Sequence, residues 1–159
     1  MIGKIILASV FAALPAVALA AKAPPPPTQA GMLTCQVSPG VGLLITSQKA
    51  LQCDFTSTGS NRHDRYVGSI SKLGIDVGAT TGGQIVWAVY RAGRSLRPGD
   101  LAGNYCGVSA EASVVGGLGA NALVGGTNKS VSLQPFSVEG QTGLNIAVGV
   151  SELSLERAR

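Results

Sequence analysis

The stretch that decides the fold runs from Gly103 to Gly126 and reads GNYCGVSAEASVVGGLGANALVGG. Small and β-branched residues dominate this stretch, proline is absent from it, and Glu111 is its one charged residue. Residues 119–125 (GANALVG) are echoed by residues 143–149 (GLNIAVG), with Gly, Asn, Val and Gly in matching places. Glycines that recur within apolar alternation indicate strand positions chosen for close packing or curvature.

Strict alternation in both copies separates an apolar face from a face of glycine and asparagine. The apolar face would carry Ala120, Ala122, Val124, Leu144, Ile146 and Val148. The opposite face would carry Asn121 and Asn145. We therefore predict two matched amides on one face, which either bond each other's strands or line a small polar lumen.

Further strands are expected along the whole chain, separated by short glycine turns. The clearest is 84–90, in which Ile85, Trp87 and Val89 face one way. A short strand is expected at 42–46, and a long hairpin loop at 91–99. No run of ten or more residues beyond the first 20 has a helical period. The pattern predicts an all-β fold: a single antiparallel barrel or sandwich of about nine strands with Gly-rich turns.

The first 20 residues have the order of an export signal. Lys4 gives a positive start, an uncharged apolar run extends from Ile5 to Ala18, and Ala18-Leu19-Ala20 meets the small-x-small cleavage rule. The apolar run is shorter than the roughly 20 residues that a membrane span needs. We predict cleavage after Ala20 and a periplasmic or secreted protein with no transmembrane span.

A proline-rich linker is expected at 21–31, because Pro24 to Pro27 enforce an extended, stiff conformation. The β domain would then occupy 32–156. Charged residues make up 13% of the chain, below the roughly 25% typical of soluble domains. The formal net charge of +4 is too mild to indicate a nucleic-acid partner. A near match to a dinucleotide fingerprint at 117–122 fails because Gly125 and Gly126 would break the required helix, so no cofactor is expected.

The chain has three cysteines, and export would place them in an oxidising compartment. We expect a Cys35–Cys53 disulfide, worth about 3 kcal/mol for the loop it closes, and a free thiol at Cys106. If a strand at 42–46 lay between them, their Cα atoms would be about 9–10 Å apart, beyond the bridging limit of about 7 Å. Either the two strands are direct neighbours or the bridge lies at a sheet margin. The cysteines and the single histidine lack the spacing of a metal site.

Two groups of residues are candidates for chemistry. Five arginines in polar segments could meet phosphates or anionic headgroups bidentately: Arg62, Arg65, Arg91, Arg94 and Arg97. The alternative for them is a solubilising role. His63, beside Asp64, could act as a general base, but a histidine in a polar loop without a partnered nucleophile is more often solvated.

Several segments together resemble the DUF992 family, small exported proteins of alphaproteobacteria with no assigned activity. They are the Cys35…Cys53 opening through Trp87, then 101–105 (LAGNY), 119–121 (GAN), 133–135 (LQP) and 140–145 (GQTGLN). The resemblance covers roughly residues 31–156, and Cys106 departs from its pattern, in keeping with an unpaired thiol. The Gly-rich second half is similar, more faintly, to the SYLF/Ysc84 lipid-binding module and the DUF1134 envelope proteins. None of these families supplies catalytic residues.

The sequence thus favours a non-enzymatic binding or structural module of the cell envelope, with an anionic lipid or glycolipid as first ligand. Three alternatives remain open. The first is a small periplasmic hydrolase that uses His63, and it requires a Ser or Asp within hydrogen-bond reach of the imidazole. The others are an outer-membrane-associated β-barrel and a subunit that assembles through exposed strand edges.

Overall fold

Strict alternation of buried and exposed residues shapes the long strands at the start of the domain. The computed structural model describes residues 26–38, 48–72, 83–93, 95–108, 119, 121–136 and 150–159. In β2 (Gln48–Ser57), Leu51, Cys53 and Phe55 are buried, whereas the residues between them are exposed. Since side chains of a strand alternate between its two sides, this pattern gives β2 one face toward a core and one toward water.

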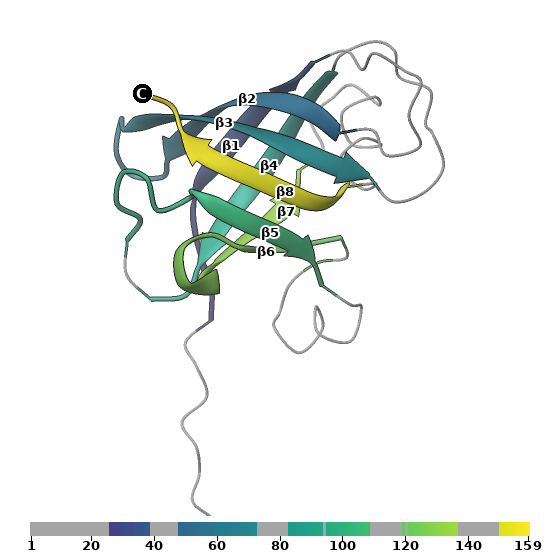
Figure 1. Cartoon of the computed structure of the whole chain (residues 1–159). Helices are drawn as coiled ribbons and strands as arrows, with labels where there is room; N and C mark the ends of the chain where they lie inside the picture. Colours follow the sequence, from purple (N-terminus) through teal and green to yellow (C-terminus); the bar gives the residue numbers. More distant parts are fainter. Residues whose placement is uncertain are drawn as a thin grey trace, which may run out of the picture.

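The described residues form eight strands that close into one antiparallel barrel in the order β1-β2-β3-β8-β5-β6-β7-β4 (Figure 1). The barrel is one of the two architectures expected from the sequence. The strands other than β2 are β1 (Thr28–Val37), β3 (His63–Lys72), β4 (Gly83–Arg91), β5 (Gly103–Gly107), β6 (Leu123–Gly125), β7 (Val131–Pro135) and β8 (Val150–Arg157). Closure comes from β4, which pairs along nearly its whole length with β1. The first strand begins at Thr28, inside the segment expected as a linker.

The inside of the barrel is a packed apolar core. Its largest fully buried side chains are Trp87, Tyr66, Tyr105 and Phe55. Ile85, Trp87 and Val89, which were predicted to share one face of a strand, do belong to this core, as do Tyr66 and Ile70 of β3. The barrel therefore resembles small barrels whose interior is filled by side chains.

The connection 92–102 differs from the expected hairpin loop. A hairpin would pair β4 with β5, but β4 pairs with β1 and β7, and β5 pairs with β6 and β8. The chain instead leads from one wall of the barrel to another, and it contributes Leu96 and Leu101 to the core. Burial of these two leucines outweighs the local preference for a tight turn.

The glycine-rich repeat also differs from the expected alternation. Asn121 has φ 63° and lies in a turn, so the strand β6 begins only at Leu123. Leu123 and Gly125 face the core and Val124 faces outward, the reverse of the predicted faces. The left-handed backbone conformation of Asn121 shifts which side chains face inward, and the sequence pattern did not predict this shift. Asn145 and the rest of the second copy up to Gly149 lie outside the described residues.

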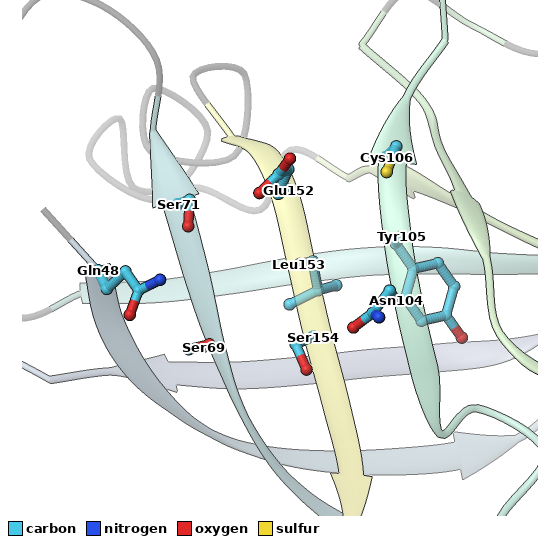
Figure 2. A pocket seen from close by; sticks show the side chains of 9 residues that line it. All are labelled: Gln48, Ser69, Ser71, Asn104, Tyr105, Cys106, Glu152, Leu153 and Ser154. Atoms are coloured by element: carbon cyan, nitrogen blue, oxygen red, sulfur yellow. The ribbon is translucent and has the colours of Figure 1, made fainter. Parts of the chain in front are cut away.

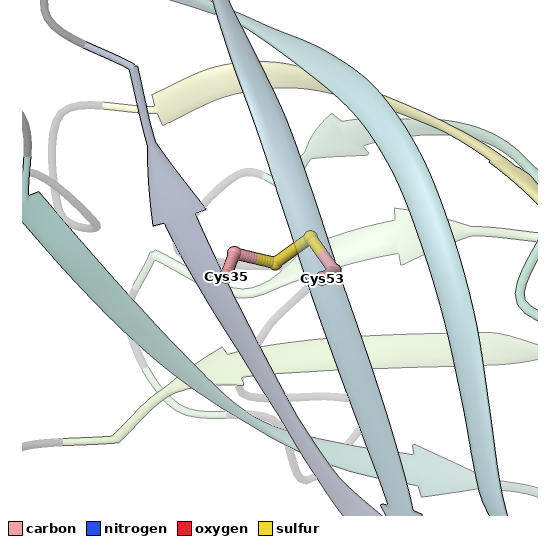
Figure 3. Close-up of a disulfide and its surroundings, with 2 residues drawn as sticks. All are labelled: Cys35 and Cys53. Atoms are coloured by element: carbon pink, nitrogen blue, oxygen red, sulfur yellow. A yellow bond between two sulfur atoms is a disulfide. The ribbon is translucent and has the colours of Figure 1, made fainter. Parts of the chain in front are cut away.

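The Cys35–Cys53 disulfide joins neighbouring strands (Figure 3). Cys35 and Cys53 are directly opposite each other on β1 and β2, with their Cα atoms 4.0 Å apart. Both sulfurs belong to residues buried in the core. Of the two arrangements expected from the sequence, the one in which the two cysteine-bearing strands are direct neighbours is correct. The strand expected at 42–46 lies outside the described residues. No helix in the described part of the chain has the length and apolar character to cross a membrane.

Candidate functional site

Arg91 and Asp100 form a close ion pair at the end of the barrel where β4 leads into β5. The Arg91 Nη1 atom lies 2.8 Å from Asp100 Oδ2, and both side chains are largely buried. The backbone N–H of Arg97 donates to the same oxygen over 2.9 Å. This backbone hydrogen bond and the Arg91 guanidinium hold the pKa of Asp100 below its usual range. Asp100 is thus ionised and fixes the connection onto β4.

Arg62 makes a second, similar attachment. Its Nη1 atom donates to the carbonyl oxygen of Leu96 over 2.7 Å, and its Nε atom lies 3.2 Å from Asp64 Oδ2. The Asp64 side chain is 7% exposed, so its charge needs the nearby guanidinium. The Arg62 guanidinium carbon also lies 6.0 Å from the Phe55 ring centroid. Arg62 therefore stabilises the end of the barrel.

Two buried tyrosines complete the attachment of the connection. The N–H of Gly99 donates to the Tyr66 hydroxyl over 3.1 Å, and the Tyr105 hydroxyl donates to the carbonyl of Leu101 over 2.8 Å. Burial raises the pKa of the Tyr66 and Tyr105 hydroxyls, so both stay neutral. Neutral hydroxyls here act as hydrogen-bonding groups that hold the loop.

Three exposed arginines gather at this same end, and we call them the basic rim: Arg65, Arg97 and Arg157. The Arg65 and Arg97 side chains are 84% and 79% exposed. The N–H of Ala158, next to Arg157, donates to the carbonyl of Arg65 over 2.9 Å. The Arg157 side chain also packs against Gly99, two residues from Arg97. Three guanidinium groups from separate elements therefore share one end of the barrel.

The carboxylates next to the rim leave its guanidinium groups accessible. Asp54 lies 3.6 Å from Arg65 in a largely solvent-exposed pair, and Asp100 lies 3.8 Å from Arg97 while its main partner is Arg91. Solvent-exposed ion pairs contribute about 0–1 kcal/mol, so an anion can displace them at little cost.

The structure thus separates the five predicted arginines into different roles. Arg62 and Arg91 bind buried carboxylates, whereas Arg65 and Arg97 reach solvent. Arg94 lies outside the described residues. Arg157 and Asp100 were not singled out from the sequence. The only signal for Asp100 was its place directly after the Pro98-Gly99 turn, and no sequence pattern paired it with Arg91.

His63 is exposed, at the start of β3. Its Nδ1 atom lies 3.2 Å from the Thr56 hydroxyl, which is opposite it on β2. No serine or aspartate of the described residues is bonded to the imidazole. This geometry gives the hydrolase hypothesis no support, and the non-enzymatic interpretation stays a prediction. Across the described ranges, no group of three or more His, Cys, Asp or Glu residues could hold a metal ion.

The remaining site residues are Asn121 and Cys106. Asn121 is exposed in the turn before β6, and its pairing with Asn145 stays a prediction. Cys106 is a free, exposed cysteine on β5.

The comparisons with known proteins find one family. A family model described as "Protein of unknown function (DUF992)" matches residues 14–156, which is most of the chain. No curated protein and no solved structure matches.

Proposed function

Because the chain belongs to the DUF992 family, whose function is unknown, we propose its role from its own geometry: a non-enzymatic exported module that docks on anionic lipid or glycolipid. The observation that carries the proposal is the basic rim, three exposed guanidinium groups at one end of the barrel. Export through the signal at 1–20 would place this rim next to envelope lipids.

The charges beneath the rim favour this role. Asp64 and Asp100 are buried and already balanced by Arg62 and Arg91. Among the exposed charges next to them, Arg65, Arg97 and Arg157 outnumber Asp54 and Glu156, so the net exposed charge is positive. Each Arg near an anionic surface contributes about 1 kcal/mol, and the attraction decays over a Debye length of about 10 Å at 0.1 M salt. Guanidinium groups also bind phosphate oxygens bidentately.

Co-sedimentation with lipid vesicles tests the proposal. The mature protein should sediment with phosphatidylcholine vesicles that contain phosphatidylglycerol, should not sediment with pure phosphatidylcholine, and should be released by high salt. The triple variant Arg65→Gln, Arg97→Gln, Arg157→Gln should bind about a hundredfold more weakly, as expected for three lost contributions of about 1 kcal/mol each. The Arg97 substitution leaves the backbone N–H that bonds Asp100 in place.

Two matched variants separate charge from folding. The corresponding triple lysine variant keeps the charges and should keep most of the binding. Glu156→Gln removes an exposed negative charge beside Arg157 and should strengthen binding. No sedimentation with anionic vesicles at low salt, or equal binding by the glutamine triple variant, would rule out this function.

A further inference from the structure

A polar groove lies on the outer surface of the barrel, across four adjacent strands, β2, β3, β8 and β5 (Figure 2). Its volume is about 300 Å³, at the lower end of the range for small-molecule sites. The polar side chains that line it are Gln48, Ser69, Ser71, Asn104, Glu152 and Ser154, with Cys106 beside them. No part of the basic rim lines this groove.

Strand register arranges these groups in two rows. One row crosses the sheet as Gln48, Ser71, Glu152 and Cys106, because each residue is paired with the next on the neighbouring strand. The second row contains Ser69, Ser154 and Asn104. At a strand spacing of about 4.8 Å, the four-residue row is about 14 Å long, the three-residue row is about 10 Å long, and the rows lie about 7 Å apart. The groove therefore offers polar groups over an area rather than at one point.

These polar groups are available to a ligand. The side chains of Ser69, Asn104, Glu152 and Ser154 make no hydrogen bond or ion pair with any other residue in the described part of the chain. Serine hydroxyls and amides both donate and accept hydrogen bonds, and an ionised carboxylate accepts them. Sugar hydroxyls, which donate and accept as well, match this set.

The charge of the groove narrows the class of ligand that it can bind. Among the described residues that line the groove, Glu152 is the one that carries a charge, and its carboxylate would repel an anion. We propose that the groove binds a neutral saccharide unit, with Glu152 accepting hydrogen bonds from two adjacent hydroxyls and Ser69, Ser154 and Asn104 binding the others. This site goes beyond the lipid-docking function and does not depend on it.

Cys106 provides a direct reporter of occupancy. With the Cys35–Cys53 disulfide intact, it is the only free thiol of the three cysteines, and it lines the groove. The probes are glucose, galactose and N-acetylglucosamine, with glucuronic acid as an anionic comparison. The neutral sugars should slow alkylation of Cys106 by iodoacetamide and shift the backbone amide signals of β3, β8 and β5 in NMR spectra. Glucuronic acid should do neither.

Variants locate the effect within the groove. Glu152→Gln should weaken binding of the neutral sugars about tenfold, as expected when a charge-assisted hydrogen bond is lost. Glu156→Gln is the matched control, because it makes the same change on the same strand outside the groove, and it should leave binding unchanged. Ser154→Trp should fill the groove and abolish binding. Asn104→Ala, a milder change, should weaken binding even if the tryptophan variant does not fold.

A separate arm of the test distinguishes a free saccharide from one that is part of a polymer. Co-sedimentation with insoluble chitin detects a polymer-bound sugar, and the NMR titration detects a free one. Binding in either arm that Glu152→Gln weakens supports the groove. The proposal is overturned if no neutral sugar and no chitin binds at tens of millimolar sugar. It is equally overturned if the shifted amides lie outside β2, β3, β8 and β5, or if Glu156→Gln weakens binding as much as Glu152→Gln.

Discussion

At the scale of single residues, Asp100 connects the basic rim to the fold. Its Oδ2 atom receives hydrogen bonds from Arg91 and from the N–H of Arg97, and its carbonyl oxygen accepts the N–H of Thr127. One residue therefore holds β4, the connection 92–102 and the turn before β7 together. Because it is ionised and buried, its loss leaves the Arg91 charge without a partner.

We expect Asp100→Asn to lower the free energy of unfolding at pH 7 by about 1.5–3 kcal/mol, the range for hydrogen bonds to charged groups. Its depressed pKa means that Asp100 stabilises the folded state above the ordinary aspartate value of about 3.9. This stabilisation is lost as the pH falls through the folded-state pKa. The difference between wild type and variant in urea unfolding should therefore shrink at pH 3 and below.

The exposed Asp54 serves as the control for this prediction. Asp54→Asn breaks the solvated pair with Arg65 and should change stability by at most about 1 kcal/mol. An Asp100→Asn variant as stable as wild type at pH 7, or a difference that grows in acid, would show that Asp100 does not hold the connection.

At the scale of strands, the glycines of the central stretch differ in what surrounds them. A Cβ at Gly125 would meet the carbonyl oxygen of Asn104 on β5, whereas a Cβ at Gly107 has no atom nearer than 3.8 Å. We expect Gly125→Ala to cost about 1–3 kcal/mol through overpacking and Gly107→Ala to be neutral or slightly stabilising. Thermal unfolding of the two variants measures this. Equal effects would mean that close strand approach is not why Gly125 is glycine.

Alternation made the long strands predictable from sequence, and it is clearest in β1 and β2, where every second residue from Gly31 to Val37 and from Lys49 to Phe55 is buried. The short strands have too few positions for alternation to be recognised. In β6, the turn at Asn121 also reversed which residues were predicted to face the core. The pairing of β4 with β7 could not be predicted from the sequence either, because contacts between distant segments leave no local pattern. Arginine-rich segments indicated part of the rim, but the Arg91–Asp100 pair depends on how the connection 92–102 packs on β4, and the groove depends on register between β3, β8 and β5.

Closure of the sheet is relevant to the alternative in which the protein assembles through exposed strand edges. Every described strand is paired on both sides in the cyclic order. A free edge, which such assembly needs, would require a pair such as β1 and β4 to separate first. The assembly alternative therefore receives no support from the described strands.

At the scale of the whole molecule, most apolar side chains of the described residues lie inside the barrel and most polar ones outside, although Val67 and Phe136 are exposed. On the outer side of β1 and β2, Gln36, Gln52, Asp54 and Thr56 are exposed. A membrane-spanning barrel has the reverse arrangement, an apolar outer band around a polar interior. The described strands thus give the outer-membrane alternative no support, and they leave the outer surface free for polar ligands such as the proposed saccharide.

A single core implies that the barrel unfolds as one unit, and the disulfide should stabilise all of it. Cys35 and Cys53 close a loop of the unfolded chain, so Cys35→Ala with Cys53→Ala should lower the free energy of unfolding by about 3 kcal/mol. Cys106→Ala, at an exposed position, should change it by less than about 0.5 kcal/mol. Urea unfolding followed by tryptophan fluorescence from Trp87 and by circular dichroism should give coincident single transitions for both variants. Separate transitions in the double variant would show instead that β1 and β2 form a unit independent of the strands β5 to β8.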